Sequence, residues 1–260
     1  MIGPLPYIGG KNRLAVEIIS LLPEHTTYVE PFAGGAQVLF HKAPSRVEVL
    51  NDLDFDIVNF FRVCQWHHDE LMRLLRYLVV SRKLHGLYAA TNPETLTDIQ
   101  RAARFFYLLK NSYGGLVVNQ HFHYGVTQSP NYNPERIPLT IEAVNERLRR
   151  VQIECLPYEQ VLEKYDRTTT CFYLDPPYYK KFLYKFNLED HEFVQLAERL
   201  KKLKGKFILS LNDHPEVRRI FQDFHVRTTS LVYTAKPGAR ARYGELLIAN
   251  FTLEKNAGVS

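Results

Sequence analysis

Phe172-Tyr173-Leu174-Asp175-Pro176-Pro177-Tyr178 is a short apolar run that ends in a carboxylate, two prolines and an aromatic ring. A residue before proline is disfavoured in the helical region and proline fixes its own φ, so the backbone after Asp175 is stiff. The Pro176 carbonyl is available as an acceptor beside the Asp175 carboxylate. Two acceptors next to the flat ring of Tyr178 suit a planar base with an exocyclic amine. The alternative interpretation is a strand that simply runs into a proline-rich turn.

The segments around this motif alternate between strand-like and helix-like patterns. Helical apolar spacing predicts helices at 11–22, 37–41, 190–203 and 215–221. Short apolar runs predict strands at 26–30, 46–50, 151–156, 171–174 and 206–211. Such alternation is typical of a parallel sheet with helices on its faces. A terminal antiparallel pair is predicted at 224–233 and 245–251, around a loop at 236–243.

The pattern changes between the second and third predicted strands. Residues 54–109 are helical and strongly charged, and residues 111–138 are rich in Gly, Asn, Tyr, His and Pro, which indicates loop and hairpin. A basic helix is predicted at 141–150. We therefore expect an α/β core formed by residues 1–58 and 151–260, interrupted by an insert at 59–150.

The composition fits a globular protein with a polyanionic partner. The 260 residues carry a net charge of +5, which is compatible with nucleic acid but does not demand it. Cys155 and Cys171 lie in apolar runs and are expected to be buried thiols without a disulfide. Neither the cysteines nor the histidines have metal-ligand spacing, so no metal site is expected. No signal peptide or membrane-length apolar run is visible, and a cytosolic protein is expected.

A second group of motifs points to a nucleoside-bearing cofactor. Gly34-Gly35-Ala36 follows the first predicted strand and permits a close approach to the backbone. Asp52 ends the next strand, where an acid commonly binds ribose hydroxyls. The loop lacks the full Gly-x-Gly-x-x-Gly set of a dinucleotide site, so S-adenosylmethionine fits better than NAD. In the segment Tyr7-Ile8-Gly9-Gly10-Lys11, the lysine is a candidate to reach a carboxylate, although a helix-capping turn is an equal alternative.

Taken together, these motifs resemble the Dam-type (D12 class) adenine-specific DNA methyltransferases. The resemblance implies a doubly wound, Rossmann-like α/β core that binds S-adenosylmethionine, with the insert as a helical and hairpin target-recognition domain. It covers nearly the whole chain, in the family's order. The matching segments are Tyr7 to Lys11, Glu30 to Ala36, Asp52, Arg104 to Leu116, Asp175 to Tyr178, Phe207 to Asn212 and Glu245 to Ile248.

The resemblance also implies a reaction and its residues. A methyl group would pass from S-adenosylmethionine to N6 of an adenine flipped out of duplex DNA. The implied catalytic residues are Asp175, Pro176, Pro177 and Tyr178. The implied cofactor-binding residues are Tyr7, Gly10, Lys11, Glu30, Phe32, Gly34, Asp52 and Asp175. Expected DNA contacts, chosen among basic and polar residues of the insert and the loop after the motif, are Arg101, Arg104, Lys110, Asn111, Tyr113, Asn119, Lys180, Lys181 and Lys185.

Two departures from the family pattern are visible. Ala36 stands where many members have glycine, and the arginine that GATC-reading members carry after the hairpin leucine is absent from Leu116-Val117-Val118-Asn119. The resemblance therefore does not extend to GATC specificity, because the usual guanine contact is missing. Double-stranded DNA is the expected partner of a monomer in a bacterial or phage-infected cytoplasm, with a cognate restriction endonuclease as a further candidate. Alternatives are a catalytically silent DNA-binding protein, a cytosine N4 methyltransferase and an RNA methyltransferase.

Overall fold

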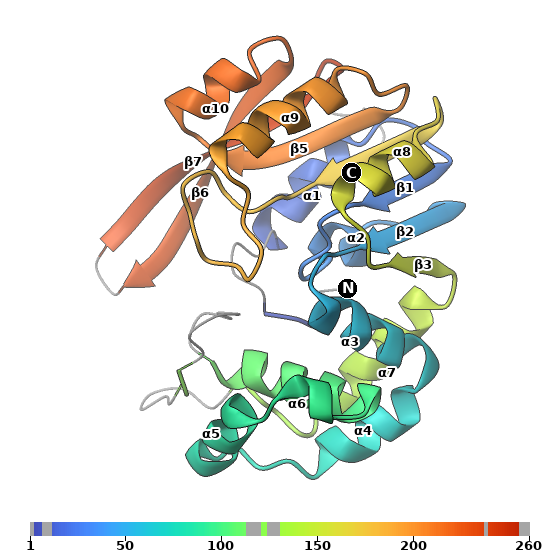
Figure 1. Ribbon diagram of the computed structural model, residues 1–260, viewed down its shortest axis with the longest axis vertical. Coiled ribbons are helices and arrows are strands. Elements are labelled where there is room, and N and C mark those ends of the chain that lie inside the picture. The colour runs from blue at the N-terminus through green and yellow to red at the C-terminus, as the bar shows by residue number, and fades with distance from the viewer. Residues whose placement is uncertain (1–2, 7–11, 113–120, 124–130, 237–238, 255–260) are drawn as a thin grey trace.

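A single mixed sheet organises the molecule. The computed structural model describes residues 3–6, 12–112, 121–123, 131–236 and 239–254, and within them seven strands pair in the order β3-β2-β1-β4-β5-β7-β6 (Figure 1). Strands β1 to β5 are parallel, whereas β7 is antiparallel to both β5 and β6. The bounds are β1 (Thr27–Glu30), β2 (Val47–Asn51), β3 (Val151–Glu154), β4 (Thr170–Leu174), β5 (Lys206–Asn212), β6 (His225–Lys236) and β7 (Ala239–Ala249).

The strand order confirms the predicted doubly wound α/β fold. The chain proceeds from β1 outward to β2 and β3, and then returns to the other side of β1 to form β4 and β5. The winding direction therefore reverses between β1 and β4. In open sheets of this kind, ligands bind beyond the carboxyl ends of the strands at the reversal. Those ends are Glu30 on β1 and Leu174 on β4, directly before the two motifs that the sequence marked.

Both faces of the sheet are covered by helices. Successive side chains of a strand point to opposite faces, and on β4 Cys171 and Tyr173 join one apolar cluster while Phe172 and Leu174 join another. Residues 171–174 form a continuous apolar run because both faces of β4 are buried. Residues of α8 (Tyr158–Tyr165), α9 (Asp190–Leu200) and α10 (Pro215–Ile220) belong to the cluster of Phe172 and Leu174. Residues of α1 (Asn12–Leu21) and α2 (Gln37–His41) belong to the cluster of Cys171 and Tyr173 (Figure 1).

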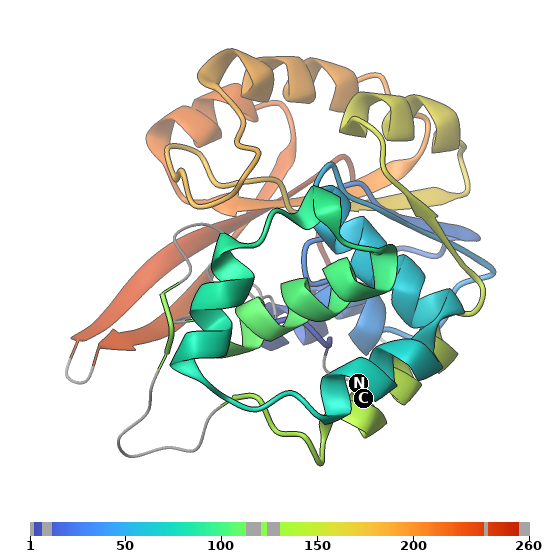
Figure 2. The ribbon, with the colours of Figure 1, turned by 60° about the horizontal axis from the view of Figure 1, so that its bottom comes forward.

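The segment between β2 and β3 forms a group of helices beside the sheet (Figure 2). The apolar cluster that includes Tyr28 of β1 continues into this group through Phe60, Phe106 and Val144. The insert thus shares a core with one face of the sheet, and its expected boundary at residue 58 lies within the first of these helices. They are α3 (Phe55–Trp66), α4 (His68–Arg76), α5 (Arg82–Ala90), the 3-10 turn η1 (Pro93–Thr95), α6 (Asp98–Asn111) and α7 (Ile137–Leu148).

Three element predictions were wrong in detail. Helix α7 begins at Ile137 rather than at 141, since Pro138 occupies the first helical turn, where its missing N–H costs no hydrogen bond. Helix α8 was not predicted, although its buried residues Tyr158, Val161 and Leu162 have helical spacing. The expected loop at 236–243 is largely strand, since β7 begins at Ala239 and pairs with β6 beyond the last β5 pairing, Asn212 with Glu245.

The cysteine prediction holds for Cys171, which is buried, and fails for Cys155, which is exposed. Strand β3 is an edge strand that already ends at Glu154, so the residue after it leaves the sheet. Among the described residues, no three His, Cys, Asp or Glu side chains are grouped so that they could hold a metal ion. None of the helices that the structure describes combines the length and apolarity needed to cross a membrane.

Candidate active site

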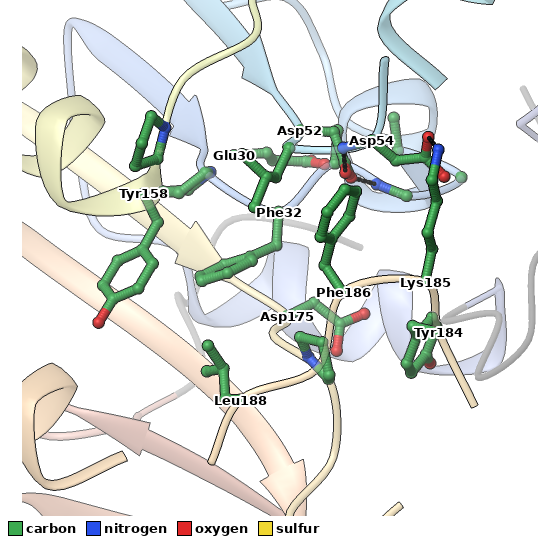
Figure 3. A pocket seen from close by; sticks show the side chains of 18 of the residues that line it. Glu30, Phe32, Asp52, Asp54, Tyr158, Asp175, Tyr184, Lys185, Phe186 and Leu188 are labelled. Atoms are coloured by element: carbon green, nitrogen blue, oxygen red, sulfur yellow. Dashed lines mark hydrogen bonds and ion pairs between the residues drawn. The ribbon is translucent and has the colours of Figure 1, made fainter. Parts of the chain in front are cut away.

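A cavity of about 550 Å³ opens where β1, β2 and β4 end (Figure 3). Its volume is in the range of small-molecule and cofactor sites. The described residues that were predicted to bind the cofactor all line it, and the predicted residues Tyr7, Gly10 and Lys11 lie outside the described part of the chain. The lining members of the predicted set are Glu30, Phe32, Gly34, Asp52 and Asp175.

The glycine loop forms one wall of the cavity and is tied to the end of β2. Gly34 and Ala36 both have left-handed backbone, with φ of 47° and 49°. The Gly34 amide donates to Asp52 Oδ2 (2.9 Å), and the Ala33 amide donates to the Asn51 carbonyl (2.8 Å). A left-handed conformation costs an L-residue roughly 1–2 kcal/mol. Ala36 therefore occupies a position that favours glycine.

Asp52 is positioned to accept hydrogen bonds from a ligand. Its Oδ1 accepts from the Asp54 amide and its Oδ2 from the Gly34 amide, both at 2.9 Å, so the carboxylate orientation is fixed from two sides. Burial raises the pKa of Asp52 to about 6 in spite of these hydrogen bonds. The group is therefore mainly ionised at neutral pH. A fixed carboxylate of this kind suits a pair of ribose hydroxyls.

Glu30 lies deeper, at the floor of the cavity, and is only 1% exposed. Its Oε1 accepts from the Tyr28 hydroxyl and from the Leu39 amide, both at 2.8 Å, which joins β1 to α2. Burial raises the pKa of Glu30 to about 8, with the hydrogen bonds acting in the opposite direction. At pH 7 the group is therefore largely a neutral acid.

We predict that Glu30→Gln removes a pH dependence of folding. A carboxyl whose pKa is higher in the folded than in the unfolded protein stabilises the fold below its usual pKa of 4.5, and that contribution is lost as the pH rises through about 8. The loss is at most about 1.4 kcal/mol per pH unit for one proton. Thermal unfolding at pH 5, 6.5 and 8 should give the variant a Tm that falls less steeply than that of the wild type. The exposed Glu163→Gln is the control, and parallel curves for Glu30→Gln and the wild type would show that Glu30 is ionised.

The motif at residues 175–178 is held by the neighbouring strands. Ser210 Oγ of β5 donates to Asp175 Oδ1 (3.0 Å) and lies 3.1 Å from the hydroxyl of Tyr173. The Tyr178 hydroxyl donates to both carboxylate oxygens of Glu245 on β7, at 2.9 and 3.0 Å. Asp175 and Pro177 line the cavity, and Pro176 is buried. The backbone of the four motif residues is therefore fixed where it follows β4, and the Asp175 carboxylate faces the cavity.

Sequence reasoning identified Phe32 but missed the residues that complete its wall of the cavity. The rings of Phe32 and Tyr158 lie 5.2 Å apart, centroid to centroid, and Leu156 and Pro157 continue this apolar surface. Figure 3 shows Phe32 and Tyr158 on the same side of the site. The available signal was position, because residues 156–158 follow a predicted strand whose end faces the same edge as Glu30. A flat apolar wall of this kind suits the faces of a purine ring.

The loop after Tyr178 covers the other side of the cavity, with Tyr184, Phe186 and Leu188 among its lining residues (Figure 3). Lys185 Nζ lies 3.2 Å from Asp54 Oδ1 and 3.8 Å from Asp56 Oδ2, at the start of α3. This ion pair connects the loop to the insert across the cavity. Lys185 was predicted to contact DNA, and its ammonium group lies at the cavity, paired with Asp54.

Three of the other expected DNA contacts are engaged within the protein. Arg101 is 6% exposed and pairs with Asp56 (2.6 Å) and Glu94 (2.8 Å). Asn111 is 3% exposed and donates to the Tyr107 carbonyl. Arg104 Nε donates to a backbone carbonyl of α5 (2.6 Å). Their burial and pairing argue against phosphate contacts for Arg101 and Asn111 and give both residues a role in holding the insert together.

The remaining expected DNA contacts differ in their exposure. Lys181 is exposed, and Lys180 is exposed and pairs with Asp190 (2.7 Å). Lys110 is partly buried, with its ammonium group 5.3 Å from the centre of the Phe106 ring, and burial lowers its pKa. The two other predicted contacts, Tyr113 and Asn119, lie outside the described residues.

The chemistry of the lining residues fits S-adenosylmethionine. The ionisable groups among the described lining residues are the cation Lys185 and the acids Glu30, Asp52, Asp54, Glu159, Asp175 and Glu192, of which Glu30 is largely neutral at pH 7. Acidic side chains repel polyphosphates and attract cations, and carboxylates accept hydrogen bonds from hydroxyl and ammonium groups. A cofactor with ribose hydroxyls, an ammonium group and a positively charged sulfur therefore matches this set. A pyrophosphate-bearing dinucleotide does not.

Comparison with known proteins supports the same assignment. The chain is similar to a type II methyltransferase, M1.LlaDCHI, of Lactococcus lactis subsp. cremoris, with 27% identity over 94% of each chain. It is 23% identical to the DNA adenine methylase of Escherichia coli (strain K12), over 94% of this chain and 93% of that protein. It is also 27% identical to the DNA N-6-adenine-methyltransferase of Escherichia phage P1, where the match covers 86% of this chain but only 32% of the phage protein.

Among solved structures, a class I S-adenosylmethionine-dependent methyltransferase from Listeria monocytogenes aligns with 95% of this chain and 60% of its own, at 9% identity. Its TM-score of 0.40 is too low to support a conclusion, and the fold class rests on the strand order given above. The family model is decisive, since the model of the D12 class N6 adenine-specific DNA methyltransferases matches residues 7–235. This chain belongs to the D12 class of N6 adenine-specific DNA methyltransferases.

Proposed function

We propose that this protein methylates N6 of an adenine that has been flipped out of duplex DNA, with S-adenosylmethionine as the methyl donor. The observation that supports the proposal best is the position of Asp175. Its carboxylate lines the cofactor cavity, and the two prolines and Tyr178 follow it directly. One side chain thus lies between a cofactor site and an aromatic ring on which a base can stack.

The motif residues act mainly by positioning. S-adenosylmethionine supplies, when bound, a methyl group on a positively charged sulfur. The Asp175 carboxylate and the Pro176 carbonyl accept hydrogen bonds from the N6 amine and orient its lone pair toward the cavity. Tyr178 stacks on the base, which is worth roughly 1–3 kcal/mol and offsets part of the cost of flipping. Orientation and fixed charges of this kind account for catalysis without a covalent intermediate on the protein.

The chemistry of each cavity residue matches it to one part of the cofactor. Asp52 is fixed by two backbone amides and would hold the ribose hydroxyls. The pair of rings formed by Phe32 and Tyr158 would cover the purine. Glu30 would shape the floor as a neutral acid, since burial raises its pKa to about 8.

A labelling experiment tests the reaction directly. Purified protein is incubated with isotope-labelled S-adenosylmethionine and mixed-sequence duplex DNA, and the DNA is then digested to nucleosides. Labelled N6-methyladenine is the expected product. Labelled N4-methylcytosine would assign the cytosine reaction. The absence of label from DNA, with cofactor binding demonstrated by a rise in Tm, would leave RNA methylation or a binding-only role.

We predict that Lys185→Met weakens cofactor binding rather than DNA binding. The Lys185–Asp54 pair joins the covering loop to α3. Because the Lys185 side chain is 46% exposed, solvent screens the pair, and we take its worth as that of a surface pair, about 0.2–1 kcal/mol. The dissociation constant of S-adenosylmethionine, measured by calorimetry, should rise about two- to five-fold. Lys181→Met is the matched control in the same loop. It should leave cofactor affinity unchanged and reduce the slope of log K for DNA against log[salt] by about 1. Equal cofactor affinity in Lys185→Met and the wild type would contradict the role of the pair.

The assembly proposed for this reaction is a single chain on double-stranded DNA. The cofactor cavity and the whole catalytic motif are contributed by one chain. We propose that the insert at 59–150 reads the target sequence, since α3, the helix that leads into it, begins at the cavity, where Asp54 and Asp56 pair with Lys185. A restriction endonuclease with the same recognition sequence is the candidate partner, because M1.LlaDCHI is a type II methyltransferase.

A further inference from the structure

Glu245 is a buried carboxyl group that the mechanism above does not use. It lies on β7, is 2% exposed, and pairs in register with Asn212, the last residue of β5. Both of its carboxylate oxygens accept from the hydroxyl of Tyr178, at 2.9 and 3.0 Å. Burying a carboxylate is costly unless hydrogen bonds compensate for the lost water. The contact with Tyr178 is one such compensation, and it touches the ring proposed to stack on the base.

The hydrogen bond fixes the far end of the Tyr178 ring. At its near end, the backbone is constrained because the tyrosine follows two prolines, each of which fixes its own φ. A phenol that is held at its Cα and at its hydroxyl oxygen can no longer choose freely among side-chain rotamers. The direction of the long axis of the ring is therefore set by two anchors, one on the motif and one on β7.

The position of Glu245 is itself tightly determined. The preceding residue is Gly244, whose carbonyl accepts from the Asp213 amide (2.9 Å). A Cβ atom at position 244 would lie 2.9 Å from the Cβ of Asp213, so the strand end of β5 approaches β7 as closely as glycine allows. This close approach fixes the backbone of β7 one residue before Glu245. The carboxylate is thus held on a rigid part of the sheet and not on a loop.

From these contacts we infer that Glu245 is a positioning residue, which holds the ring of Tyr178 in the place where the flipped adenine stacks on it. The inference rests on the proposed function for its consequence, since the ring matters to catalysis only if a base stacks on it. The geometric part, a ring oriented by Glu245, is independent of any substrate. The two parts are therefore tested by separate measurements.

Fluorine NMR tests the geometric part without DNA. The protein is labelled with 3-fluorotyrosine, and the Tyr178 signal is identified by its loss in Tyr178→Phe. Glu245→Gln should move or broaden that signal. The control is Glu154→Gln, which removes a carboxylate that accepts from Tyr165 (2.7 Å) on the far edge of the sheet. It should affect the Tyr165 signal alone. A Tyr178 signal that is unchanged in Glu245→Gln would overturn the inference.

Kinetics test the catalytic part. Glu245→Gln should lower kcat for N6-methyladenine formation about 10-fold, equivalent to about 1.4 kcal/mol, with the affinity for S-adenosylmethionine unchanged. Tyr178→Phe should act similarly, and the double variant should be little worse than either single variant. Once the recognition sequence is known, 2-aminopurine can replace the target adenine. Its fluorescence should change less on binding of Glu245→Gln than on binding of the wild type. An unchanged kcat, or a parallel loss of cofactor affinity, would refute the positioning role.

The fluorine NMR and the kinetic measurements distinguish failure of the proposed function from failure of the inference about Glu245. If the wild type forms no N6-methyladenine, the proposed function fails, and the fluorine signal still decides whether Glu245 orients the ring. If the wild type is active and the signal responds to Glu245→Gln while kcat does not, the orientation exists but does not serve catalysis, and the inference is wrong. Loss of folding in the variant is detected by the absence of a cofactor-induced rise in Tm.

Discussion

Replacing Asp175 by alanine is expected to reduce kcat for adenine methylation at least about 10²- to 10³-fold, the usual cost of losing a fixed electrostatic contact in an active site. The carboxylate accepts from Ser210 (3.0 Å) and lines the cavity. Its removal leaves the N6 amine with the Pro176 carbonyl as its only proposed acceptor on the motif. The rate is measured as labelled N6-methyladenine under saturating DNA. Asp175→Asn keeps one acceptor oxygen and should retain part of the activity.

Two controls separate this effect from a general loss of structure. Asp190→Asn removes an exposed carboxylate that pairs with Lys180 on the covering loop, and it should leave kcat unchanged. Ser210→Ala removes the hydrogen bond to Asp175 without removing the carboxylate, so a smaller loss of about 10-fold is expected. The Tm of Asp175→Ala should stay close to that of the wild type, since Asp175 is only partly buried. Wild-type activity in Asp175→Ala would refute the proposed mechanism.

The parts of the fold that could be predicted are those encoded by local patterns. The strand before Asp175 is buried at every position because both of its faces are covered, and the strand that ends at Glu30 leads into the glycine loop. The rule that ligands bind at the carboxyl ends of parallel strands then brings Glu30, Asp52 and Asp175 together, and all three line the cavity. Residue type and position along a strand were sufficient for these residues.

The parts that could not be predicted depend on partners distant in sequence. Arg101 looks like a surface cation in a charged helix, and only the folded chain shows it paired with Asp56, 45 residues earlier. Lys185 likewise finds Asp54, 131 residues away. Glu245 reads as one polar residue at the start of an apolar run, and its contact with Tyr178 follows from the antiparallel pairing of β7 with β5. Local periodicity contains no information on such pairings.

Replacing Glu48 by methionine is expected to destabilise the protein by about 3–5 kcal/mol, the usual cost of breaking a buried ion pair. Glu48 lies on β2 and binds two cations at once. Lys42 Nζ lies 2.6 Å from Oε1, and the Arg147 guanidinium contacts both carboxylate oxygens at 2.5 and 2.9 Å. The side chains of Lys42 and Glu48 are each 4% exposed and that of Arg147 is 12% exposed. Without the carboxylate, two cations remain buried with reduced compensation.

The directions of the pKa shifts agree with this account. Burial alone would raise the pKa of Glu48, but hydrogen bonds from Arg147 and Lys42 outweigh it and hold the pKa below its usual value. Burial lowers the pKa of Lys42 even beside Glu48, so the pair compensates only partly for the lost hydration. A carboxylate with a lowered pKa stabilises the fold above its usual pKa of 4.5, and this contribution is lost as the pH falls through its folded value.

The measurement is the free energy of unfolding from denaturant titration at pH 7. The control is Glu154→Met, which breaks an exposed pair with Lys164 and should cost no more than about 1 kcal/mol. A further variant replaces Lys42, Glu48 and Arg147 together by methionine. It should recover much of the loss, because a buried ion cluster exchanged for apolar side chains of similar size is often neutral in stability. A loss below about 1 kcal/mol in Glu48→Met would show that water reaches the cluster.

The ion cluster of Lys42, Glu48 and Arg147 also connects the insert to the core. Arg147 lies on α7, the last helix of the insert, and besides Glu48 it donates to the Leu39 carbonyl of α2 (2.9 Å). One guanidinium therefore ties the insert to both β2 and the helix after the glycine loop. Leu39 is also the residue whose amide donates to Glu30 at the floor of the cavity. If Glu48→Met loosens this junction without unfolding the chain, cofactor affinity should fall together with stability. Glu154 lies on the outer edge of the sheet, so cofactor affinity should not fall in Glu154→Met.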